Sequence, residues 1–111
     1  MGYFVRHRYG GHDIDPPLSA LSALLDEVGE DPSDHEHVGV SVTHESEWCV
    51  AIYSGWTVTI EHLEHLEIEP HHLDAGQDRA YVLRLLRAAA DGDLELLERQ
   101  PWKPGYHSSN E

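Results

Sequence analysis

Between residues 37 and 61 the chain alternates apolar and polar side chains along three segments joined by very short connectors. Residues 37–43 set valines against small or polar residues, and residues 48–53 and 56–61 repeat the alternation with Trp, Val and Ile. A period of two is typical of a strand with one buried face, and connectors this short join antiparallel neighbours. The region therefore predicts a three-stranded antiparallel meander.

In the segments on either side of residues 37–61, apolar residues recur at the spacing of a helix. Leucines and Val28 recur on one stripe after Asp15-Pro16-Pro17, so we expect a helix that Asp15 caps and that ends near Gly29. Residues 78–90 show a second stripe, behind a capping-box spacing that begins at Asp74. Asp93 is placed to cap a short helix over residues 94–99.

Residues 3–8 mix aromatic and β-branched side chains and predict a first strand, followed by a turn over residues 9–13. The expected order is strand, helix, three strands and two helices. This order favours an α+β, two-layer sandwich: a four-stranded, mostly antiparallel sheet with two main helices and a short C-terminal helix on one face. We expect one domain over residues 1–106 and a frayed tail over 107–111. The other sheet face would carry Ser41, Thr43, Cys49, Tyr53, Thr57, Thr59 and Glu61.

Negative charge is the most unusual global property of this chain. Its 111 residues include 21 acids against seven Lys and Arg, a formal net charge of -14. Nucleic acids and anionic membranes are poor partners, because affinity for phosphates comes largely from Lys and Arg. A basic protein partner is the natural complement. Solubility alone is the competing interpretation, and the sequence leaves both open.

Cysteine usage and apolar runs bear on the compartment. Cys49 is the only cysteine, so no intramolecular disulfide can form. The first residues lack a secretory signal, and no run of about 20 apolar residues exists to span a membrane. A cytoplasmic location is therefore expected.

Ten histidines favour two further expectations. Their protonation should weaken binding to a basic partner at about pH 5–6. His62, His65, His71, His72 and Asp74 could alternatively form a metal site, either in a metal-binding protein or in a metal-dependent enzyme, because imidazole and carboxylate suit zinc. If residues 62–65 continue a strand, however, His62 and His65 face opposite sides, and the histidines are then solvated loop residues.

Catalytic motifs give little support for an enzyme. Cys49 could be a nucleophile with His44 as its base, but a thiol in the middle of a strand of an acidic chain is better explained as a small sheet residue. The chain has no P-loop, no Gly-x-Gly-x-x-Gly and no Gly-x-Ser-x-Gly motif. No cofactor is expected in the leading interpretation.

A partner surface is the remaining prediction. Its candidate elements are exposed acidic turns at residues 30–34 and 45–47 and an aromatic tail. The candidate partner-binding residues are Asp31, Asp34, Glu45, Glu47, Glu61, Trp102 and Tyr106. In size, acidity and α+β order the chain resembles the small immunity proteins of bacterial toxin systems. That resemblance implies an inhibitor that occludes its partner stoichiometrically, without chemistry of its own. Pairing through the threonine-rich sheet face or the Trp102 tail would instead give a homodimer.

Overall fold

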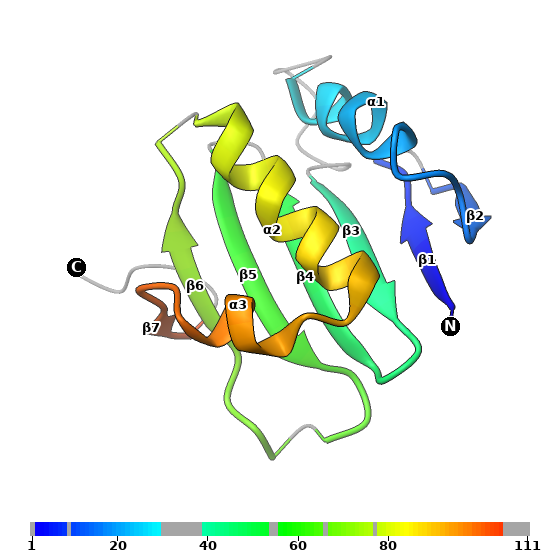
Figure 1. The fold of residues 1–111 in the computed structure, drawn as a ribbon. Coiled ribbons are helices and arrows are strands. Elements are labelled where there is room, and N and C mark those ends of the chain that lie inside the picture. Colours follow the sequence, from blue (N-terminus) through cyan, green and yellow to red (C-terminus); the bar gives the residue numbers. More distant parts are fainter. Residues whose placement is uncertain are drawn as a thin grey trace.

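The computed structural model describes residues 2–8, 10–29, 39–53, 56–65, 67–76 and 78–105. Figure 1 shows an antiparallel sheet with helices on one of its faces, so the α+β class is confirmed. The described strands are β1 Tyr3–Arg6, β2 His12–Ile14, β3 Gly39–His44, β4 Trp48–Tyr53, β5 Thr57–His62, β6 His71–Asp74 and β7 Lys103–Pro104. The helices are α1 Ala20–Asp26, the 3-10 turn η1 Glu27–Gly29, α2 Arg79–Asp91 and α3 Leu94–Glu98.

The predicted meander forms the centre of the sheet. Val42 of β3 pairs with Val50 of β4, which in turn pairs with Ile60 of β5. Val42 and Val50 are fully buried under the helices. The alternation in the sequence therefore correctly predicted both the antiparallel strands and the face that they bury.

The sheet is larger than expected, and the prediction of four strands in that order is wrong. Its seven described strands run β2-β1-β3-β4-β5-β6-β7. The additional strands β2, β6 and β7 have only two to four residues each, and β2 and β7 are exposed along their whole length. Such strands have no alternating apolar face that a sequence could display, since their backbones are held mainly by pairing with a neighbour.

The helical layer packs over the middle of the sheet. α2 lies across β3 and β4, and α1 packs beside α2 (Figure 1). Leu85 and Leu86 of α2 are fully buried in this layer. Among the described helices, none is both long and apolar enough to cross a membrane.

Two of the predicted helix caps are wrong. Asp15 has a left-handed φ of 51°, and its carboxylate accepts a hydrogen bond from the Tyr3 amide at 2.9 Å, so α1 begins later, at Ala20. Asp74 ends β6 and accepts from the Gly76 amide, while Asp78 caps α2 by accepting from the Tyr81 amide. Short polar residues can bond to a nearby backbone in turns as well as at helix ends, so a spacing alone does not distinguish the two.

The corner between α2 and α3 needs a glycine. Gly92 has a φ of 72°, and a Cβ atom there would lie 2.6 Å from Nε2 of His44. Asp93 then caps α3 as predicted, accepting from the Leu96 amide at 3.2 Å. This close approach places the corner between α2 and α3 against the end of β3.

Candidate partner-binding surface

Carboxylates gather on three segments at one end of the molecule, which we term the acidic end: residues 45–47, 63–69 and 91–99. The first two lie side by side, since the Leu63 amide donates to the Glu47 carbonyl at 2.9 Å. The third ends α2 and forms α3, above the same end of the sheet (Figure 1). The nine acids of the acidic end are Glu45, Glu47, Glu64, Glu67, Glu69, Asp91, Asp93, Glu95 and Glu98.

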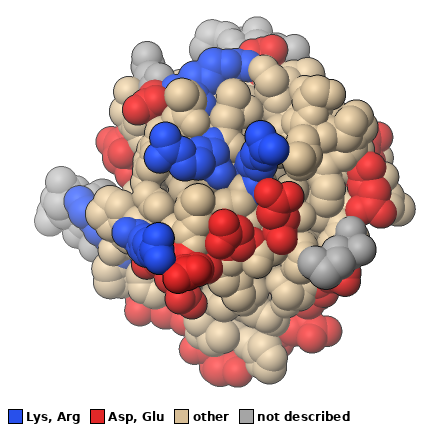
Figure 2. Space-filling model, viewed as in Figure 1, with Lys and Arg blue, Asp and Glu red and all other residues tan. Residues whose placement is uncertain are grey.

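Cations are sparse at this end of the molecule. Arg99 is the one Lys or Arg in the three segments, and it pairs with Glu95 at 2.9 Å. Figure 2 shows red side chains along the lower margin of the helical face and at its upper and right edges, with blue ones across the top, the middle and the left. Arg79 pairs instead with Asp26 of α1 at 2.7 Å, and buried Arg8 donates to the Glu27 carbonyl. Within these three segments nine carboxylates therefore stand against one arginine, and Lys103 of β7 is the next cation along the chain.

The turn between β3 and β4 holds its carboxylates in defined positions. The Glu45 side chain accepts from the Gly2 amide at 2.8 Å. Glu47 has a φ of 75°, a left-handed conformation that favours glycine. A glutamate at this position costs backbone energy that a glycine would not.

A hollow that we term the Trp groove opens at the acidic end, on the helical face of the sheet. Its volume is about 360 Å³. The lining residues come from β4, β5, the β5–β6 connection, β6, α3 and the segment after α3: Trp48, Ile60, Ile68, Glu69, His71, Glu98, Gln100 and Trp102. Ile68 is 39% exposed although it is a large apolar residue. The groove thus combines apolar walls with two carboxylates.

The walls of the Trp groove are held by hydrogen bonds inside the protein. The indole Nε1 of Trp102 donates to the Leu97 carbonyl at 2.6 Å. The Gln100 side chain donates to the Leu96 carbonyl and accepts from the Tyr81 hydroxyl. These contacts fix both side chains before any partner arrives.

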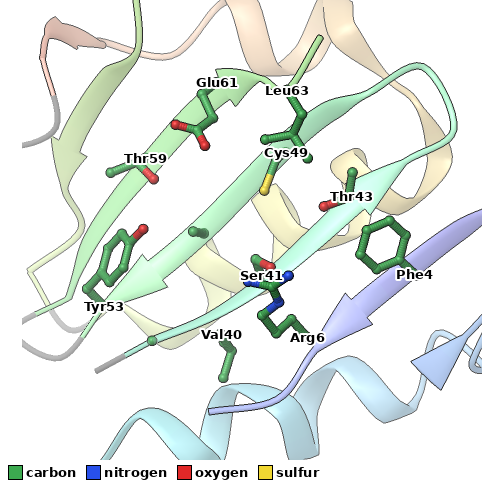
Figure 3. Close-up of a pocket in the computed structure, with 12 residues that line it drawn as sticks. Phe4, Arg6, Val40, Ser41, Thr43, Cys49, Tyr53, Thr59, Glu61 and Leu63 are labelled. Carbon is green, nitrogen blue, oxygen red and sulfur yellow. The ribbon is translucent and has the colours of Figure 1, made fainter. Parts of the chain in front are cut away.

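A second hollow, the sheet-face pocket, lies on the face of the sheet away from the helices (Figure 3). Its volume is about 320 Å³. Small residues form its floor, namely Ser41, Thr43, Cys49, Ala51 and Thr59, and larger ones form its sides, namely Phe4, Arg6, Tyr53, Glu61 and Leu63. Gly39 leaves room for Tyr53, because a Cβ atom there would lie 2.6 Å from the phenol ring. The predicted polar face is therefore a hollow with a hydroxyl-rich floor.

Cys49 lies in this floor and is nearly buried. Burial raises the pKa of its thiol above the ordinary value, although hydrogen bonds with Thr43 and Ser41 oppose the shift. His44 cannot act as its base, because Cys49 pairs with Thr43 and the next residue along the strand faces the opposite side. The arrangement keeps the thiol protonated at neutral pH.

The five residues of the alternative metal site do not gather at one place. His71 pairs with Ile60 on the helical face, whereas His72 pairs with Thr59 on the other. Nδ1 of His62 accepts from the backbone amides of Glu64 and His65, and His65 itself bonds to exposed Glu67. Asp74 lies at the far end of β6 from His71. Within the described ranges, no three His, Cys, Asp or Glu residues gather closely enough to hold a metal ion.

The predicted partner residues fall in three places. Glu45 and Glu47 lie at the acidic end, Trp102 lines the Trp groove, and Glu61 lines the sheet-face pocket. Asp31, Asp34 and Tyr106, together with the expected tail at 107–111, lie outside the described residues.

Sequence reasoning missed Ile68, Glu69 and Glu98, which line the groove beside Trp102. Ile68 and Glu69 are adjacent in the sequence, but the exposure of Ile68 and the proximity of Glu98 arise from tertiary structure and leave no signal in the sequence.

Comparison of the chain with protein-family models, with curated proteins and with solved structures found no match.

Proposed function

We propose that this chain is a non-enzymatic protein-binding module whose acidic end covers a basic surface of another protein, as an immunity-type inhibitor would. The observation that carries the proposal is the grouping of nine carboxylates with a single arginine on three neighbouring segments. Such a field attracts a cationic macromolecule, speeds its encounter and disfavours anionic competitors. Occlusion of that surface would inhibit the partner without any reacting group.

Two features of the surface support a docking role. Glu47 keeps a carboxylate where glycine would be more stable, and strain of this kind clusters at functional positions. The Trp groove adds apolar contact area beside the charges, and tryptophan is enriched among the residues that dominate binding energy.

The test uses, as candidate partners, the proteins encoded by the reading frames next to the gene for this chain. Each is mixed with the purified chain, and light scattering measures the complex, which we expect to be one to one with a basic partner. The same measurement on the chain alone reports any homodimer. The dissociation constant should rise with salt, because exposed charges more than about 10 Å apart are screened at 0.1 M salt.

A matched pair of variants separates the acidic end from overall charge. Glu64→Gln with Glu67→Gln removes two charges from the acidic end, and Asp26→Asn with Asp74→Asn removes two from the opposite end (Figure 1). We expect the first pair to weaken binding about tenfold and the second less than about twofold. Equal losses for the two pairs would show that net charge, rather than the acidic end, governs binding.

A further inference from the structure

The Trp groove has the chemistry of a receptor for one particular side chain. Resting on the function proposed above, we infer that the groove binds an arginine of the basic partner, with the guanidinium group between the carboxylates of Glu69 and Glu98 and its stem along the tryptophans.

Three of the polar atoms at the groove are hydrogen-bond acceptors. Glu69 and Glu98 are exposed carboxylates. Nδ1 of His71 lies 3.0 Å from the Glu69 carbonyl, which can only accept, so this nitrogen carries the hydrogen. In the neutral ring Nε2 is then an acceptor as well. Three acceptors therefore belong to the lining of a single hollow.

Two donors of the lining, on Trp102 and Gln100, are already used inside the protein. The Trp102 indole hydrogen goes to the Leu97 carbonyl, and the Gln100 amide goes to the Leu96 carbonyl. The carboxylates of Glu69 and Glu98 remain as acceptors for a ligand. A guanidinium group has five N–H donors and no acceptor, which complements this set.

The apolar walls favour arginine over lysine. Trp48, Trp102 and Ile68 offer a surface for an aliphatic stem. A planar guanidinium stacks on indole rings and sheds water more readily than the compact ammonium of lysine. The acidic end around the groove attracts cations before they dock.

The experiment uses the whole chain and three peptide probes that differ at one central residue. Acetyl-Gly-Arg-Gly-amide is the test probe; the citrulline peptide has the same shape without charge, and the lysine peptide has charge without a planar group. Nuclear magnetic resonance follows the three indole Nε1–H signals. Trp56 does not line the groove and is the internal reference.

We expect the arginine peptide to shift the Trp48 and Trp102 signals saturably, with a smaller response to lysine and none to citrulline. Glu69→Gln and Glu98→Gln should each raise the dissociation constant about threefold to fivefold, because each removes one exposed charge contact. The Asp26→Asn and Asp74→Asn pair should change nothing. The inference is overturned by equal shifts with citrulline, by no saturable shift with arginine, or by Glu-to-Gln variants that bind normally.

Failure of this inference can be told apart from failure of the proposed function. If the natural partner depends on Glu64 and Glu67 but not on Glu69 and Glu98, the groove assignment is wrong and the acidic end stands. If the arginine peptide binds as expected but no acidic-end substitution changes the affinity for the partner, the proposed function is wrong.

Discussion

The Trp groove and the sheet-face pocket lie on opposite faces of one sheet and begin at neighbouring residues of β4. Trp48 faces the Trp groove, and Cys49 faces the sheet-face pocket. The groove has aromatic walls and a rim of acceptors, whereas the pocket has a floor of hydroxyls with Arg6 and Glu61 on its sides. Alternation along a strand thus produces two chemically different surfaces from adjacent residues.

The charge of the two hollows differs, and this difference decides which of them suits a cationic macromolecule. The sheet-face pocket carries both signs of charge, so it has no preference for a cationic protein. The Trp groove lies within the acidic end, where long-range attraction and short-range acceptors favour the same kind of ligand. The following predictions alter one hollow at a time.

The largest effect is expected at the corner that places α3 beside the groove. Gly92→Ala combines a left-handed φ of 72° with a Cβ contact of 2.6 Å to His44. We expect a loss of about 3 kcal/mol in the free energy of unfolding, measured by urea denaturation. Gly76→Ala is the control, since its φ is 60° with open space around it, and should cost about 1 kcal/mol. Equal costs would show that the His44 contact is unimportant.

The corresponding change in the other hollow is Gly39→Ala. The new Cβ atom would lie 2.6 Å from the Tyr53 ring and 2.7 Å from the Ile52 carbonyl. We expect about 2 kcal/mol of destabilisation. Displacement of Tyr53 should also speed the reaction of Cys49 with a disulfide reagent at pH 8, where the buried thiol of the original chain reacts slowly. A thiol that reacts at the same rate in both proteins would contradict the role of Tyr53 as a wall of the pocket.

Glu47→Gly should separate stability from binding. Relief of the left-handed φ of 75° should raise the free energy of unfolding by about 1 kcal/mol. The same substitution removes a carboxylate from the acidic end and should weaken binding of the basic partner. Thermal unfolding and a binding titration measure the two effects. Unchanged binding in a stabilised variant would remove this turn from the interface.

The smallest effect concerns His7, which lies outside the lining of both hollows. Hydrogen bonds with Asp13 and then Glu27, each at 2.7 Å, raise its pKa above the ordinary value of 6.5. Because the pKa is raised in the folded state, this stabilisation is complete below about pH 6.5 and is lost as the pH rises through the folded value. His7→Gln should cost about 0.5–1 kcal/mol at pH 5.5 and less at pH 8. A cost that does not vary with pH would refute this linkage.

The sequence specified the centre of this fold better than its edges. Regular alternation predicted β3, β4 and β5 and their polar face, and the stripe around Leu85 predicted α2. β2, β6 and β7 could not be predicted, because their pairing partners rather than their side chains define them. Asp15 and Asp74 misled the cap assignments because both bond to turn amides instead.

The candidate site was harder to predict for the same reason. Trp102 was identified from its residue type, but its neighbours Glu69 and Glu98 are 29 positions apart in the sequence. They line one groove only because β6 pairs with β5 and Gly92 directs α3 toward that end of the sheet. Contacts of this kind depend on tertiary structure and leave no periodic signal in the sequence.

The most direct test is to map the chain's backbone amide and indole signals by nuclear magnetic resonance when the basic partner is bound. We expect the perturbed signals to cluster on residues 45–47, 63–69 and 91–99 and on the Trp102 indole. Perturbations centred instead on Ser41, Cys49 and Thr59 would place the partner on the opposite face of the sheet and contradict the account.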